Sequence, residues 1–381
     1  MKKIPYGRQS INKDDVDAVI KTLTGDFLTQ GPKVQEFEKK FSEYVGSKFA
    51  LAVNNATAGL HLSVLSLGLK KGDRVITTPI TFSASANCVR YVGGEVWFAD
   101  IDKNTYIICL ESVKKLIESK PNGFFKGIIA VDFAGLPVNL ELFRDLAEKH
   151  NLWIIEDACH APGAYFTDSN QIVQKCGNGK NANISVFSFH PVKHIACGEG
   201  GMITTDSQKL YNKLKLLRTH GITKENIPKK FGGWYYEMTD LGFNYRLTDF
   251  QCALGITQLA KNKKGVKKRN EIAIRYKNAF EGKIKFQYIP DNSYNAYHLF
   301  IIEVDNRDKL YEFLHSKGVL VQIHYIPIHF MPYYKKIGYL EADLKNSEKY
   351  YSNCISLPMY PSLSDDEQDY VIKHVKNFIN V

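Results

Sequence analysis

The chain has 381 residues, of which 44% are hydrophobic and 12% are aromatic. This composition provides for a large core in two domains, and it excludes a disordered chain, a collagen and a disulfide-stapled miniprotein. Fifty Lys and Arg residues against 40 Asp and Glu residues give a net charge of +10, which favours anionic ligands such as nucleotides and phosphates without choosing among them.

The cysteines and the N-terminal residues indicate where the protein works. The seven cysteines are dispersed and form no C-x-x-C pair, so we do not expect a disulfide framework. The first residues lead into the charged segment Asn12–Val16 and not into an apolar h-region, and no run of about 18 apolar residues follows. We therefore expect a cytoplasmic protein with no membrane partner.

The densest basic run, residues 261–269, is typical of the exposed face of a helix. No zinc-finger, RRM or helix-turn-helix pattern accompanies it. We therefore expect no nucleic-acid partner.

The first elements in chain order are two predicted helices, Lys13–Leu23 and Val34–Tyr44, separated by a turn that contains Gly31 and Pro32. From about residue 47 to residue 205, short apolar runs alternate with amphipathic segments. This alternation predicts stacked βαβ units, and hence an α/β fold with a mostly parallel sheet of about seven strands and helices on both faces. The strands are expected at Phe49–Val53, Arg74–Thr77, Glu95–Phe98, Gly127–Val131, Leu152–Ile155, Ile184–Phe187 and Gly201–Thr205, and the helices between them include Thr57–Leu67, Ser83–Tyr91 and Leu140–His150.

Beyond Asp206 the alternation ends, and a smaller α+β domain is predicted. A helix at Gln208–Arg218 and an irregular segment at Phe231–Tyr236 come before a long helix, Thr248–Phe280. We place the domain boundary in that helix, which gives a large domain of residues 1–255 and a small domain of residues 256–381. In the small domain, strands are expected at Ala296–Val304 and Val319–Tyr325, and helices at Asp308–Lys317 and Ser364–Ile379.

Lys193 stands out because it lies between the apolar strand that ends at Phe187 and a Gly-rich turn from which the next strand returns. A site of this kind can remove an amine from water, and desolvation lowers the pKa of a lysine. The neutral amine is the form that makes a Schiff base with an aldehyde. Most lysines are solvated surface residues, so this signal needs a second one.

The second signal is the pair Glu156 and Asp157 at the carboxyl end of an apolar strand, the edge where open α/β sheets place ligands. An Asp in this position often only caps a helix. Together with Lys193, however, it provides what pyridoxal 5′-phosphate (PLP) requires, namely an amine for its aldehyde and a carboxylate for its ring nitrogen. Asp157 suits the second role better than Glu156, because alternate side chains point to opposite faces of a strand.

The cofactor phosphate would require backbone N–H donors, ideally at a helix N-terminus. The segment Val53–Leu60 provides a strand, a turn and small residues that open a helix. Ser188, five residues before Lys193, adds a hydroxyl, and Phe82 offers a ring for stacking just after the second strand. Each of these signals is weak when taken alone.

The order of these segments resembles the DegT/DnrJ/EryC1/StrS family of sugar aminotransferases, which are PLP enzymes of fold type I. The resemblance covers nearly the whole chain. Its matching segments are Leu28–Glu38, Asn54–Leu60, Thr78–Phe82, Glu156–His160, Ser188–Lys193 with Gly198–Gly201, Gly242–Gln251 and His324–His329.

The resemblance implies a role for each matching residue of the cofactor site. Lys193 would bond to the cofactor and shuttle protons, Asp157 would hold the pyridine nitrogen, and Phe82 would stack on the ring. The other implied cofactor contacts are the Thr57 and Ala58 amides and the Ser188 hydroxyl at the phosphate, His160 near the 3-hydroxyl in place of the Gln of many members, and Asn244 from the neighbouring subunit of a homodimer with shared active sites. The implied substrate contacts are Tyr6, Thr29, Gln30, His324, Tyr325 and His329.

The implied reaction is transamination, with L-glutamate as the amino donor and the 4-keto group of a nucleotide-linked sugar as the acceptor. A branch of the same fold has His in place of the lysine and deoxygenates or dehydrates sugars, so Lys193 points to a transaminase. Three segments, Thr77–Asn87, Val186–His190 and Val321–Ile328, look most like enzymes that make UDP-4-amino-4,6-dideoxy-N-acetyl-β-L-altrosamine, a pseudaminic acid precursor. Another 4-amino sugar, of the GDP-perosamine or UDP-bacillosamine type, is the alternative.

The sequence contains weaker signals for other functions. His190, His194 and Cys197 lack the spacing of a structural zinc site, as do His324 and His329, so we expect no metal. A nicotinamide oxidoreductase would show G-x-G-x-x-G after an early strand, and the residues after Val53 do not match it. A non-catalytic sensor with a PLP fold stays open, although retention of the lysine and the aspartate argues against it.

Overall fold

The computed structural model describes residues 3–225, 232–338 and 343–379. Its centre is a seven-stranded sheet with the strand order β2-β10-β9-β6-β5-β3-β4. β10 runs antiparallel to both of its neighbours and the other pairs are parallel, so the predicted mostly parallel α/β sheet is confirmed. The strands are β2 (Phe49–Val53), β3 (Arg74–Thr77), β4 (Glu95–Phe98), β5 (Phe125–Val131), β6 (Trp153–Asp157), β9 (Ile184–Ser188) and β10 (Gly201–Thr205).

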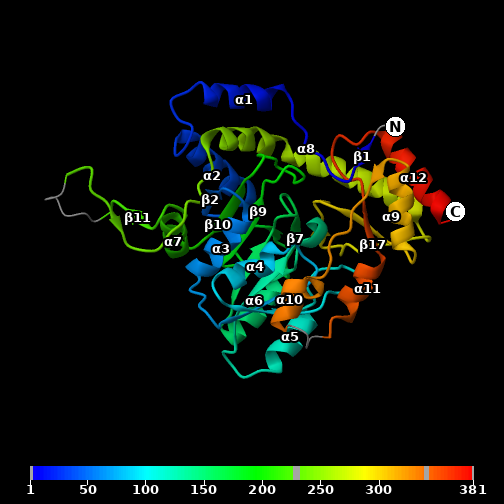
Figure 1. Cartoon of the computed structure of the whole chain (residues 1–381), viewed down its shortest axis with the longest axis horizontal. Coiled ribbons are helices and arrows are strands. Elements are labelled where there is room, and N and C mark those ends of the chain that lie inside the picture. The colour runs from blue at the N-terminus through cyan, green and yellow to red at the C-terminus, as the bar shows by residue number, and fades with distance from the viewer. Residues whose placement is uncertain (1–2, 226–231, 339–342, 380–381) are drawn as a thin grey trace.

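Helices cover both faces of this sheet, as the alternation predicts (Figure 1). On one face, α3 (Ala56–Ser66), α4 (Ala84–Tyr91) and α7 (Gln208–Arg218) share a core with strand residues such as Ile155. On the other face, α5 (Leu110–Glu118) and α6 (Leu140–His150) pack with residues such as Ile154. The side chains of successive residues of β6 thus point into different cores. By the same alternation, the side chains of Glu156 and Asp157 lie on opposite sides of the sheet.

The long helix α8 (Asp249–Phe280) joins the two parts of the chain. α1 (Lys13–Leu23) begins with a capping box between Asn12 and Asp15, and it lies along α8, as Figure 1 shows. α2 (Pro32–Val45) packs on the same part of α8. Val266 of α8 belongs to the core beside the large sheet and Ile272 to the core of the C-terminal part. The boundary at residue 256 stays a prediction, and the change of core falls further along the same helix.

The C-terminal part is built around β15 (Phe300–Glu303), and the two strands predicted there are shorter than expected. Tyr297 has a left-handed φ of 48°, so the extended backbone begins only after it. The second strand is limited to β16 (Val319–Leu320), which pairs with β1 (Ile4–Pro5). Of the residues left out of both strands, His298, His324 and Tyr325 line the cavity described below.

The remaining elements complete the description. They are β7 (Tyr165–Thr167), β8 (Val173–Lys175), β13 (Lys285–Phe286), β14 (Ser293–Tyr294), β17 (Cys354–Leu357), α9 (Arg307–Ser316), α10 (Pro332–Ile337), α11 (Lys345–Asn353) and α12 (Asp365–Phe378), with short 3₁₀ turns at Phe133–Gly135 and Ile328–Phe330. None of the helices in the described residues is long and apolar enough to cross a bilayer.

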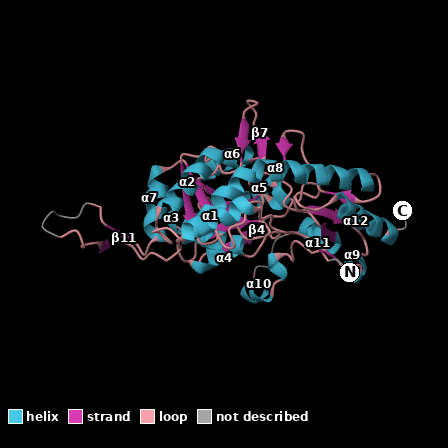
Figure 2. Ribbon diagram, turned by 90° about the horizontal axis from the view of Figure 1, so that it is seen from above, coloured by secondary structure: helices cyan, strands magenta, loops and turns pink. Residues whose placement is uncertain are grey.

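A two-stranded extension leaves the body of the molecule after α7 (Figures 1 and 2). It consists of β11 (Ile222–Thr223), paired antiparallel with β12 (Glu237–Met238). Of the predicted irregular segment, Phe231 lies outside the described residues. Trp234 is 76% exposed and Leu241 is 79% exposed, so the extension presents large apolar side chains to the outside.

Candidate active site

A cavity of about 470 Å³ lies where the carboxyl ends of β6 and β9 meet the start of α3 and two loops of the C-terminal part. This is the sheet edge at which α/β proteins place ligands. Nine of the predicted site residues line it: Tyr6, Thr57, Phe82, Asp157, His160, Ser188, Lys193, His324 and Tyr325.

Lys193 follows β9 and reaches the cavity from the turn before β10. Burial lowers the pKa of this amine from its ordinary value to about 8. Roughly a fifth of the amine is then neutral near physiological pH, far more than for an ordinary lysine, and the neutral amine is the form that attacks a carbonyl carbon. Its Nζ lies 3.3 Å from Nε2 of His298.

Asp157 ends β6 and is buried on the cavity wall. The Ser85 hydroxyl donates to its Oδ2 at 2.6 Å, and the Cys159 N–H donates to its Oδ1 at 3.2 Å. Both donors fix the carboxylate in place. A buried carboxylate held in this way suits a cationic partner such as a protonated pyridine nitrogen.

The start of α3 forms another wall of the cavity. Asn55 caps the helix, and the Ala58 N–H donates to its Oδ1 at 2.8 Å. A predicted bond from Ala58 to a phosphate would require this capping bond to break, and Ala58 itself does not line the cavity. Thr57 and Ser188 do line it, so the helix N-terminus and a hydroxyl meet there, as an anion requires.

Phe82 stands at the mouth of the cavity with 60% of its surface exposed. Its ring centroid is 6.2 Å from that of Tyr325. Large aromatic rings are usually buried, so a ring left open beside a cavity is available to stack on a flat ligand. An amine, a buried carboxylate, a helix N-terminus and an open ring around one cavity together fit PLP.

A group of buried aromatic and histidine side chains closes the cavity on the side of the C-terminal part. Nδ1 of His160 accepts from the Ala134 N–H at 3.3 Å, and its Nε2 lies 3.2 Å from the Tyr325 hydroxyl. Burial lowers the pKa of His160 well below its usual value, so the ring is neutral and its Nε2–H donates to Tyr325. The His298 ring packs against His160 with centroids 4.2 Å apart.

Sequence reasoning missed His298 and Ser85. Both touch a predicted site residue, but neither belongs to a pattern that marks a functional site. His324, which was predicted, lies within 2.9 Å of the Ser356 hydroxyl, and burial lowers its pKa to about 3.

The structure does not bring the other predicted residues to this cavity. Asn244 is exposed and pairs through its backbone with Thr219. Thr29 bridges to Thr248, and Gln30 lines a separate cavity of about 910 Å³. The buried His329 lies 3.3 Å from Glu348. The site roles of these residues stay predictions.

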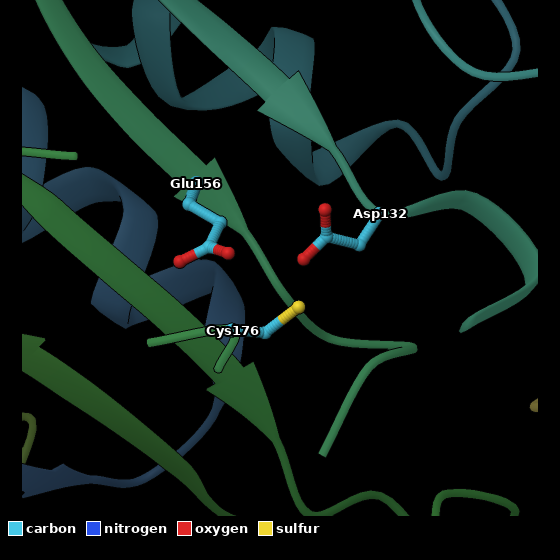
Figure 3. A group of neighbouring side chains, drawn as sticks. All are labelled: Asp132, Glu156 and Cys176. Atoms are coloured by element: carbon cyan, nitrogen blue, oxygen red, sulfur yellow. The ribbon is translucent and has the colours of Figure 1, made fainter. Parts of the chain in front are cut away.

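One group of potential metal ligands occurs among the described residues, behind the sheet edge. Figure 3 shows Asp132, Glu156 and Cys176 pointing toward one another, and one ligand atom from each lies within 4.8 Å of the others. The Val138 N–H donates to Asp132 and the Gly177 N–H donates to Glu156. Burial raises the pKa of Glu156 and, more strongly, that of Asp132, and Oδ2 of Asp132 has no described partner. A proton on Asp132, donated to Glu156, satisfies both carboxyl groups without a metal.

We expect Asp132→Asn to lower the free energy of unfolding by less than about 1 kcal/mol, because the amide can donate to Glu156 as the protonated acid does. Asp132→Ala leaves buried polar groups unpaired and should cost about 2 kcal/mol. Chemical denaturation of both variants measures the difference. If Asp132→Asn is the more damaging change, or if it removes a metal that elemental analysis finds in the wild type, the shared proton is the wrong interpretation.

The chain is similar to known proteins over nearly its whole length. The model of the DegT/DnrJ/EryC1/StrS aminotransferase family matches residues 9–376. The spore coat polysaccharide biosynthesis protein SpsC of Bacillus subtilis is 38% identical over 99% of this chain and 97% of its own length. A UDP-4-amino-4,6-dideoxy-N-acetyl-beta-L-altrosamine transaminase of Campylobacter jejuni is 37% identical over 97% of this chain and 95% of its own.

Two solved structures show the same architecture. PseC of Helicobacter pylori, an aminotransferase involved in the biosynthesis of pseudaminic acid, superposes with a TM-score of 0.90 at 31% identity, over 100% of both chains. The PLP form of Spr1654 from Streptococcus pneumoniae superposes with a TM-score of 0.89 at 26% identity, over 99% of both chains. The fold of this chain is therefore that of PLP-dependent aminotransferases.

Proposed function

This chain belongs to the DegT/DnrJ/EryC1/StrS aminotransferase family, and from that premise we propose that it moves an amino group from L-glutamate to the 4-keto group of a nucleotide-linked 4-keto-6-deoxy sugar. It is an aminotransferase, and PLP is its cofactor. The observation that carries the proposal is that a desolvated lysine amine and a buried carboxylate, Lys193 and Asp157, line one cavity at the sheet edge.

Each of these cavity residues has its own role in the reaction. PLP, when bound, supplies an electrophilic carbonyl carbon and an electron sink. Lys193 holds the cofactor and moves a proton at Nζ, while Asp157 keeps the ring nitrogen protonated. Thr57 and Ser188 hold the phosphate at the start of α3, and Phe82 orients the ring by stacking.

The acceptor we propose is UDP-2-acetamido-2,6-dideoxy-L-arabino-hexos-4-ulose, on a route to pseudaminic acid. The Campylobacter jejuni relative and the PseC neighbour support this choice. SpsC is as similar to this chain, and its name gives a spore coat polysaccharide but no sugar nucleotide. A nucleotide-linked 4-keto sugar of the GDP-perosamine or UDP-bacillosamine type is therefore kept as the second candidate.

The proposal is tested in two stages with the purified protein. Absorption spectra before and after addition of L-glutamate follow the first half of the reaction, and 2-oxoglutarate is its expected product. The amino-loaded enzyme is then offered UDP- and GDP-linked 4-keto sugars one at a time, and NMR identifies the product. Turnover only with another 4-keto sugar would favour the second candidate. A protein that binds PLP but does not react with any amino donor would be a sensor.

We also propose that the enzyme is a cytoplasmic homodimer in which each active site uses residues of both subunits. Asn244 is exposed, in keeping with a role in the neighbouring subunit. The extension after α7 carries Trp234, Met238 and Leu241, each more than half exposed. Exposed apolar side chains on an extension are typical of a surface that a partner covers.

Mixing two inactive variants, Lys193→Ala and Asn244→Ala, is expected to restore activity. In a hybrid dimer, one of the two sites receives an intact Lys193 and an intact Asn244, so random exchange of subunits should return about a quarter of the wild-type rate. The control is a mixture of Lys193→Ala with Asp157→Asn. These two residues line the cavity of one chain, so no hybrid site is intact. Equal rates in both mixtures would exclude the shared site.

A further inference from the structure

We propose that His298 is the positioning residue of Lys193: its imidazole accepts a hydrogen bond from the lysine Nζ at Nε2, and so directs the amine into the cavity. This proposal rests on the role of Lys193 in the proposed function. His298 lies on the loop between β14 and β15, is 4% exposed and lines the same cavity as Lys193. The two nitrogen atoms are 3.3 Å apart.

His298 is the described hydrogen-bond partner of this amine. Within the part of the chain that the structure describes, no second side chain forms a hydrogen bond to Nζ of Lys193. A lysine carries four rotatable bonds, and one directional contact restricts where its Nζ points. The position of His298 therefore sets the position of the amine.

The backbone around His298 is held in place by Arg269 of α8. The guanidinium donates to the carbonyl oxygens of Tyr297, Met359 and His298, at 3.0, 2.8 and 3.4 Å. Arg269 is only 1% exposed, so these bonds lie in the interior. Because the His298 ring also packs on His160, both its backbone and its side chain are fixed.

The charges around the contact determine which hydrogen-bonding role the imidazole takes. The titratable and charged groups that act on the imidazole, besides Lys193, are His160, His194 and Arg269. Asp157 and Cys159 act on the lysine, and His324 acts on His160. Burial and the neighbouring cation Lys193 lower the pKa of His298 well below its usual value, so the ring is neutral. A neutral imidazole has one acceptor nitrogen, and both the ammonium and the amine of lysine can donate to it.

The other ring nitrogen leaves this assignment free. Nδ1 of His298 is buried and has no hydrogen-bond partner among the described residues, so no other hydrogen bond opposes a hydrogen on Nδ1. With the hydrogen on Nδ1, Nε2 presents its lone pair to Lys193. The hydrogen bond is stronger when the lysine is an ammonium, because one partner is then charged. Loss of the acceptor should therefore lower the lysine pKa still further.

The test measures the reactivity of Lys193 in the full-length chain after removal of the cofactor. Acetic anhydride modifies neutral amines only, and mass spectrometry of the peptide that contains Lys193 gives the extent of modification at each pH. We expect the midpoint of the wild type near pH 8. His298→Leu should move it down by about one unit, because a hydrogen bond to a charged group is lost. His298→Gln retains an acceptor and should leave the midpoint close to that of the wild type.

Two readouts separate positioning from a merely structural role. With the PLP-loaded enzyme, His298→Leu should lower kcat about tenfold or more and leave the KM for L-glutamate nearly unchanged. If this variant does not fold, nitrogen NMR of histidine-labelled wild-type protein answers the question, because the proposal requires a bare Nε2 and a protonated Nδ1 at neutral pH. An imidazolium, or a hydrogen on Nε2, would overturn it.

The labelling experiment uses neither an amino donor nor a sugar. If the enzyme fails to transaminate but the midpoint shifts as expected, the contact stands and the proposed function fails. An unchanged or higher midpoint in His298→Leu, in an active enzyme, would refute the positioning role alone.

Discussion

Lys193→Ala is expected to lower the rate of transamination by about 10⁴-fold or more, because the variant lacks both the nucleophile and the proton carrier of the reaction. The fold should persist, since Lys193 is a cavity residue and not part of a hydrophobic core. Stopped-flow mixing with L-glutamate measures the rate, and the visible absorption band of the lysine-bound cofactor should be absent.

Lys193→Arg is the matched control for charge. Arginine retains a cation at this position, but it stays protonated and cannot attack a carbonyl carbon. The arginine variant should therefore be as slow as the alanine variant, even if it retains the cofactor. Wild-type turnover in either variant would show that another residue performs the reaction.

The seven-stranded sheet could be predicted well because its signals are local. The run Phe49–Val53 is apolar, is bounded by polar residues and is recovered with the same limits in β2. Lys193 and Asp157 each follow such a run. Since the carboxyl ends of β6 and β9 lie at the same sheet edge, placing the strands also placed both residues.

Contacts between distant segments could not be predicted in this way. His298 lies 105 positions from Lys193, on a loop whose path depends on the left-handed conformation of Tyr297 and on carbonyl contacts with Arg269. Asp132 meets Glu156 only because Val131 is in register with Asp157 across β5 and β6. Neither contact can be inferred from the spacing of residues within one segment of the sequence.

Thr29 and Gln30 show that a match to the family in sequence order does not predict where a residue lies in the fold. Their segment is ordered along the chain as in the family, yet Gln30 lines a different cavity from Lys193. The order of motifs indicates ancestry, whereas the distance between them depends on packing and, for Asn244, on the proposed second subunit.

Asp157→Asn is expected to lower kcat by about 10³-fold, because the amide has no charge to keep the ring nitrogen protonated, and the electron sink then fails. The amide nearly preserves the size of the side chain, so the binding of PLP should weaken far less than the rate. Single-turnover kinetics with L-glutamate measure the chemical step, and equilibrium titration measures the affinity for PLP.

Ser85→Ala provides a graded control for the same carboxylate. It removes the donor that lies 2.6 Å from Oδ2 and leaves the N–H of Cys159 in place at Oδ1. A carboxylate that keeps its charge but loses one of its two described donors should retain most of its effect, so we expect a loss of about tenfold. Comparing kcat of the wild type, Ser85→Ala and Asp157→Asn thus separates the effect of the carboxylate's orientation from the effect of its charge. Near-normal turnover in Asp157→Asn would assign the ring nitrogen to another group, because no orientation of a neutral amide replaces the missing charge.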